Sequence, residues 1–110
     1  MDMVRRAFTL RLKPGALDEY VRQHDEVWPE LVAELKGQGI SELTIFERNG
    51  DLFVYCEATD YEAMDRVWAS DVHDRWAKVM DPLIGVNADN KVVSVPVTEI
   101  WHLDTGVAKA

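Results

Sequence analysis

The sequence predicts an α+β fold in which one antiparallel sheet carries two helical segments. Two observations predict it. Apolar residues alternate with period two in several short stretches and recur at helical spacing in two longer ones. An Asn49-Gly50 pair, the strongest short signal for a tight hairpin, lies between two alternating stretches. The 110 residues suit one domain, and we expect that domain to cover 1–104, with a frayed tail at 105–110.

Residues 4–13 predict the first strand. Phe8, Leu10 and Leu12 fall on one face of it, and the residues between them fall on the other. Pro14-Gly15 ends the alternation.

Apolar residues then recur at helical spacing over 15–36, which predicts the first helix. Pro29 interrupts it. A proline inside a helix has no N–H to donate and crowds the carbonyl four residues earlier. We therefore expect a kink between Asp25 and Pro29.

The stretches 40–48 and 52–58 predict two strands joined by the hairpin, which makes them antiparallel neighbours. Both carry apolar residues in both phases, as in Ile45 with Phe46 and Phe53 with Val54. A sheet that is apolar on both faces is covered on both. We expect either a partner subunit or a ligand cavity on the second face, and we predict a homodimer.

A second helical region follows over 59–81. Thr59 and Glu62 have the spacing of a capping box, and Ser70 is placed to cap a second segment. A loop over 83–91 leads to a last strand over 92–103, in which Pro96 indicates an edge position or a bulge. The order strand, helix, strand, strand, helix, strand is the ferredoxin-like pattern, with both helices on one face of a four-stranded antiparallel sheet.

Charge and motifs exclude several classes of function. The net charge of −8, from 12 basic and 20 acidic residues, disfavours nucleic acid as a partner. Arg5, Arg6 and Arg11 cluster, but their alternation favours a solvated or paired sheet face. The one cysteine, Cys56, lies in an apolar run and is expected to be buried. We expect no metal and no cofactor, since no ligand spacing or phosphate loop is present.

No apolar run reaches the roughly 20 residues of a membrane span, and no signal-peptide pattern follows the first residues. We therefore expect a cytoplasmic protein with no membrane partner.

His24 is the first candidate for chemistry. It lies on the apolar stripe of the first helix, four residues after Tyr20 and next to the expected kink. His73 lies among charged neighbours, and His102 lies near the end of the chain. From these features alone, His24 is either a packed core residue or a catalyst.

Four tryptophans offer flat apolar surfaces against which the C–H face of a sugar ring could pack, with core packing as the alternative for at least two of them. They are Trp28, Trp68, Trp76 and Trp101. Asp89 and Asn90, in the loop before the last strand, could bind sugar hydroxyls or serve as ordinary turn formers.

The run from Tyr20 to Leu31 reads Tyr, three residues, His, three residues, Trp-Pro-Glu-Leu. This run resembles the first-helix motif of the L-rhamnose mutarotases, and the similarity covers nearly the whole chain. Further matching segments are Arg5-Arg6-Ala7-Phe8, Ser70-Asp71-Val72, Arg75-Trp76, Asn87-Ala88-Asp89-Asn90 and Val97-Thr98-Glu99-Ile100.

The resemblance implies a homodimeric α+β barrel that interconverts the anomers of L-rhamnose. It implies that His24 is the proton donor and that Tyr20 and Trp76 touch the sugar. Trp28 and Asp89 complete the expected substrate-binding set. The chain departs from relatives at Ala77, where some have Trp, at Leu43, where some have Tyr, and at Asp25, where an Asn is found.

Mutarotation opens the hemiacetal ring and closes it on the other face, which needs one proton acceptor and one donor. Histidine titrates near neutral pH, so we expect His24 to donate a proton to the ring oxygen. The base is left open between Asp89 and a water molecule. Two other functions stay open on the same barrel. One is a different enzyme, of the cofactor-free monooxygenase or haem-degrading type, and the other is a non-catalytic dimer.

Overall fold

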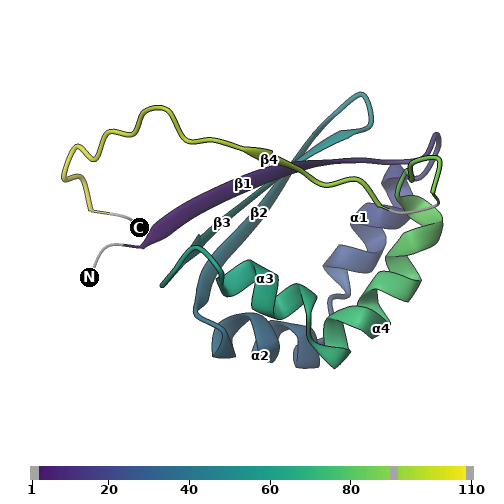
Figure 1. The fold of residues 1–110 in the computed structure, drawn as a ribbon, viewed down its shortest axis with the longest axis horizontal. Coiled ribbons are helices and arrows are strands. Elements are labelled where there is room, and N and C mark those ends of the chain that lie inside the picture. The colour runs from purple at the N-terminus through teal and green to yellow at the C-terminus, as the bar shows by residue number, and fades with distance from the viewer. Residues whose placement is uncertain (1–2, 90–91, 109–110) are drawn as a thin grey trace.

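The computed structural model describes residues 3–89 and 92–108, which form one antiparallel sheet with the helices on one of its faces (Figure 1). The sheet has four strands in the order β2-β3-β1-β4. The strands are β1 (Val4–Arg11), β2 (Ile40–Arg48), β3 (Asp51–Ala58) and β4 (Val95–Val97). This order and the one-sided helices confirm the ferredoxin-like prediction.

The helices form the second layer. They are α1 (Leu17–Asp25), α2 (Pro29–Gly37), α3 (Ala63–Trp68) and α4 (Asp71–Met80), with a 3₁₀ turn η1 (Asp81–Leu83) directly after α4. In Figure 1, α1 and α4 cover one end of the sheet, and α2 and α3 cover the other.

The expected kink is a complete break, so the prediction of one helix over 15–36 is wrong. Trp28 is extended, with φ −66° and ψ 134°, and Pro29 begins a new helix as its first residue. Proline disfavours helical backbone in the residue before it, and at a helix start its missing N–H is not needed. The break leaves His24 in the last turn of α1, so that α1 and α2 can take different directions.

The helical region after β3 also differs from prediction at its start. α3 begins at Ala63, and Thr59 does not cap it. Instead, the Asp60 carboxylate accepts a hydrogen bond from the Glu62 N–H at 3.0 Å, which forms the turn one residue later than expected. The predicted cap at Ser70 is confirmed, since its hydroxyl accepts from the His73 N–H at 3.2 Å.

The central hairpin is as predicted. Asn49 and Gly50 both have positive φ, 51° and 89°, which a tight hairpin turn of matching twist requires. The turn sets the register of β2 on β3, and Phe46 lies opposite Phe53.

The last strand is much shorter than the predicted 92–103. Val95–Val97 pair with β1, and residues 98–108 have no regular secondary structure. Pro96 cannot donate to a ladder, so β4 lies at the edge, as its proline indicated. The segment beyond β4 extends away from the helical layer (Figure 1).

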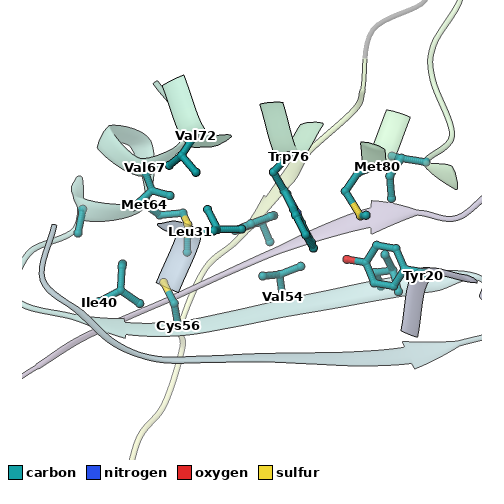
Figure 2. Packing of buried hydrophobic residues seen from close by; sticks show 14 of the residues in the cluster. Tyr20, Leu31, Ile40, Val54, Cys56, Met64, Val67, Val72, Trp76 and Met80 are labelled. Carbon is teal, nitrogen blue, oxygen red and sulfur yellow. The ribbon is translucent and has the colours of Figure 1, made fainter. Parts of the chain in front are cut away.

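The core lies between the sheet and the helices (Figure 2). Leu52, Cys56 and Val67 are its most deeply buried side chains, and Cys56 is a free thiol, as expected. On the other face of the sheet the apolar side chains are exposed. They are Phe46, Phe53, Val95 and Val97, which we call the open face.

The N-terminal arginines are ion-paired. Arg5 contacts Glu99 at 2.8 Å, Arg6 contacts Asp65 at 3.0 Å, and Arg11 contacts Asp51 at 2.8 Å. These pairs confirm that the arginines are ion-paired, with Arg5 and Arg11 on one face of β1 and Arg6 on the other. None of the helices in the described part of the chain has the length and apolar character that a membrane span requires. The domain boundary at residue 104 stays a prediction.

Candidate active site

A cavity of about 340 Å³ opens between the helices and the covered face of the sheet. Its size is at the lower end of the range typical of small-molecule sites. Most of its wall is apolar, from β1, β2, β3 and the helices. Its polar and titratable lining residues are Tyr20, His24, His73, Asp74 and Asp81.

Tyr20 and His24 lie together on α1, one turn apart, with ring centroids 4.2 Å from each other. The His24 Nδ1 lies 2.8 Å from the backbone carbonyl oxygen of Tyr20. A carbonyl only accepts, so Nδ1 carries the proton in this contact. The hydrogen bond orients the imidazole and leaves Nε2 as the nitrogen that can exchange protons.

Trp76 connects α4 to this pair. Its ring meets the His24 ring edge-on, with centroids 5.3 Å apart at 87°. Trp76 is buried and lines the cavity, so it presents an aromatic surface beside the imidazole. Figure 2 shows Trp76 and Tyr20 reaching toward each other from opposite helices.

Trp28 packs edge-on against Trp76, at 5.2 Å and 88°. It is not among the residues that line the cavity in the described part of the chain. Arg75 lies 5.9 Å from the Trp28 ring and forms an ion pair with Glu30 at 2.9 Å. In this arrangement Trp28 supports Trp76 from outside the cavity, and direct contact of Trp28 with a ligand stays a prediction.

Burial raises the pKa of Tyr20 to about 12. Ionisation would put a charge into a mostly apolar wall, which disfavours the phenolate. At neutral pH Tyr20 is therefore a neutral phenol that can donate a hydrogen bond.

Asp89 lies apart from these residues. It is exposed in a turn where its backbone N–H donates to the Asn87 side-chain oxygen at 2.9 Å. It is not among the described residues that line the cavity. Its role as a sugar ligand stays a prediction, and Asn90 lies outside the described residues.

The structure adds His73 to the site. Sequence reasoning placed it among charged neighbours and gave it no role, yet it lines the same cavity as His24. One signal could have found it. His73 precedes Trp76 by three residues on α4, so a helix that turns Trp76 inward also brings His73 near the cavity. In residues 3–89 and 92–108, no three His, Cys, Asp or Glu side chains gather as metal ligands would.

Comparisons with known proteins identify the family of the chain. The model of a protein family described as L-rhamnose mutarotase matches residues 5–103. A curated L-rhamnose mutarotase from Oceanobacillus iheyensis is 36% identical over 104 residues, covering 93% of this chain and 100% of the relative. One from Escherichia coli is 37% identical over 103 residues, covering 92% and 99%.

The chain is also similar to proteins of known structure. The crystal structure of an L-rhamnose mutarotase from Formosa agariphila has a TM-score of 0.78 at 31% identity, covering 92% of this chain and 99% of that one. A putative antibiotic biosynthesis monooxygenase from Bordetella bronchiseptica has a TM-score of 0.68 at only 8% identity, covering 92% and 100%. That second likeness is one of fold alone and does not favour the monooxygenase alternative.

Proposed function

The chain belongs to the L-rhamnose mutarotase family, and we propose that it is an isomerase that interconverts the α and β anomers of L-rhamnose. One observation carries the proposal. In a chain of this family, Tyr20, His24 and Trp76 meet at one cavity of small-molecule size. The cavity offers a titratable imidazole, a neutral phenol and an aromatic surface.

The reaction needs no redox chemistry. A base takes the proton from the anomeric hydroxyl, the C1–O1 bond becomes a carbonyl, and the bond from C1 to the ring oxygen breaks. An acid delivers a proton to that oxygen. The open-chain sugar rotates about C1–C2, and the steps reverse on the other face of the carbonyl.

His24 is proposed as the acid. Its Nδ1–H is bound to the Tyr20 carbonyl, so a proton on Nε2 is the one available for the ring oxygen. Histidine suits this role because its charge changes near neutral pH. Tyr20, held as the neutral phenol, would hydrogen-bond a sugar hydroxyl.

Trp76 would pack against the apolar side of the sugar, and the methyl group of a 6-deoxy sugar adds to such contact. Trp28 and Asp89 are kept as proposed binding residues. Trp28 supports Trp76 at 5.2 Å, and Asp89 would need to approach from its exposed turn.

The homodimer is part of the proposal. Phe46 is 61% exposed and Phe53 is 44% exposed on the open face, and Val95 and Val97 continue this apolar surface. Beyond β4, Ile100 is 93% exposed and Trp101 is 75% exposed. Large contiguous apolar surfaces mark interaction sites, and a second copy of the chain would bury both the open face and this segment.

A cytoplasmic location is also proposed. The single cysteine, Cys56, is a buried free thiol, which suits a reducing compartment. Fractionation of cells that express the native chain would test the location.

The experiment for the function is anomer exchange by NMR. One anomeric proton of L-rhamnose is saturated and the loss of signal at the other is followed, with and without a catalytic amount of protein. Fucose and glucose serve as control sugars. We expect faster transfer for L-rhamnose. No acceleration for any sugar, from protein shown to be folded, would refute the proposal and favour the non-catalytic dimer.

A further inference from the structure

Mutarotation requires two proton transfers, and His24 can carry only one of them at a time. The cavity holds four other titratable side chains among the described residues, namely Tyr20, His73, Asp74 and Asp81. Tyr20 stays protonated at neutral pH, so it is not a base. Asp74 and Asp81 are exposed to solvent, whereas His73 is half-buried.

His73 is held in place from two sides. Ser70 caps α4 by accepting from the His73 backbone N–H at 3.2 Å, which orders the first turn of the helix. The imidazole stacks on the Trp68 ring, with centroids 5.0 Å apart and planes 20° from parallel. Trp68 in turn meets Phe8 of β1 edge-on at 5.7 Å. A chain of ring contacts therefore joins the imidazole to the sheet and restricts its rotation.

The ring nitrogens of His73 are available. Across the described residues, neither nitrogen makes a hydrogen bond to the protein. The same residues contain no fully buried side-chain nitrogen or oxygen without a partner. Since His73 lines the cavity and is only half-buried, its nitrogens can reach the cavity or its solvent.

The surroundings of His73 suit a base. Burial lowers its pKa below the usual value, and the nearby Asp74 carboxylate acts in the opposite direction with a smaller effect. The imidazole is therefore neutral at neutral pH and can accept a proton. Once it has done so, Asp74 stabilises the imidazolium.

His73 and His24 approach the cavity from different helices. Trp76 meets His24 at 5.3 Å and follows His73 by three residues on the same helix, α4, and all three residues line the cavity. An acid and a base that come from separate walls can act on different oxygens of one ring.

We propose that His73 is the second proton-transfer residue, which takes the proton of the anomeric hydroxyl while His24 protonates the ring oxygen. On ring closure His73 returns its proton to the carbonyl oxygen as it becomes the hydroxyl, and His24 takes back the proton of the attacking hydroxyl. Both histidines return to their starting protonation states, so the cycle needs no co-reactant. This assignment rests on the proposed function.

The test uses the full chain and L-rhamnose exchange by NMR. His73→Gln keeps a polar side chain of similar size but cannot titrate. We expect it to lower the maximal exchange rate by about 100-fold or more, the usual contribution of a general base, with a much smaller change in the half-saturating concentration of L-rhamnose. Lys78→Gln is the matched control, because Lys78 is an exposed residue of the same helix outside the cavity lining and should stay within about threefold of wild type.

Chemical rescue distinguishes a proton-transfer role of His73 from a purely structural one. His73→Ala leaves space at the cavity wall, and added imidazole should restore part of the exchange if His73 transfers protons. Thermal melting checks that each variant is folded. Exchange by His73→Gln within about threefold of wild type would overturn the assignment and leave the proposed function standing. A loss in His73→Ala that imidazole does not restore would likewise count against it. Absence of L-rhamnose exchange in the wild-type chain would refute the proposed function and this assignment together.

Discussion

The two faces of the sheet carry similar apolar side chains but have different surroundings. Leu52 and Phe53 are neighbours on β3, yet Leu52 is 1% exposed beneath the helices and Phe53 is 44% exposed on the open face. The covered face also borders the cavity with His24 and Trp76. A single chain therefore covers only one face of its own sheet. The proposed active site lies on the face that the chain covers itself, and the proposed dimer interface lies on the open face.

The largest expected effect is on chemistry at the covered face. His24→Ala should lower L-rhamnose exchange by about 10²- to 10⁴-fold, because a positioned acid is lost. Exchange rates by NMR measure it, with circular dichroism to verify the fold. Asp25→Asn is the matched control, since Asp25 is the exposed neighbour on the same helix. Exchange by His24→Ala at the wild-type rate would remove His24 from the mechanism.

The second effect is on the stability of the domain, through the core beneath the helices. Leu52→Ala should lower the free energy of unfolding by about 2–5 kcal/mol, because the deleted side chain leaves a hole in packed surroundings. Denaturant unfolding at fixed protein concentration measures it. The dimer dissociation constant should not change. A much smaller decrease in the free energy of unfolding would mean that neighbouring side chains fill the space left by Leu52. The covered face would then be less tightly packed than the burial of Leu52 indicates.

The role of the open face as the dimer interface is tested by introducing charged side chains there. Phe46→Glu with Phe53→Glu should raise the dimer dissociation constant by about 100-fold or more, since two carboxylates would be buried without partners. Sedimentation or light scattering over a concentration series measures it. Val21→Glu is the control, because Val21 is 47% exposed on α1, away from the open face. If the double variant stays as dimeric as wild type, the open face is not the interface.

The smallest effect should come from the segment after β4. Removal of 100–110 deletes Ile100 and Trp101 and should weaken the dimer by about tenfold. Removal of 105–110 alone should change neither dimerisation nor melting temperature, in keeping with a domain that ends at residue 104. The two truncations are compared on the same concentration series. A large effect of the shorter truncation would move the domain boundary toward the end of the chain.

Local chemistry explains why much of the fold could be predicted from the sequence. The hairpin at Asn49-Gly50 follows from the need for positive φ at both turn residues, and the strands beside it follow from alternation. The Ser70 cap and the edge position of Pro96 follow from which N–H groups are present or absent. Tyr20 and His24 could be paired because their spacing is one helical turn.

Other features depended on contacts between segments far apart in the chain. The break before Pro29 depends on where α2 packs, because the same proline permits either a kink or a new helix. The predicted last strand over 92–103 shrank to Val95–Val97, because an apolar pattern shows which residues are able to pair but does not decide which of them pair with β1.

Periodicity and turn chemistry were enough to predict the ferredoxin-like order of elements, the sheet apolar on both faces and the Tyr20–His24 pair. Only the tertiary structure brought His73 to the cavity, moved Asp89 outside its lining and put Trp28 behind Trp76. The physical reason is the distance along the chain over which each kind of interaction acts. Backbone preferences and side-chain spacing act over a few residues, whereas a cavity wall is made by segments that meet only when the helices pack on the sheet.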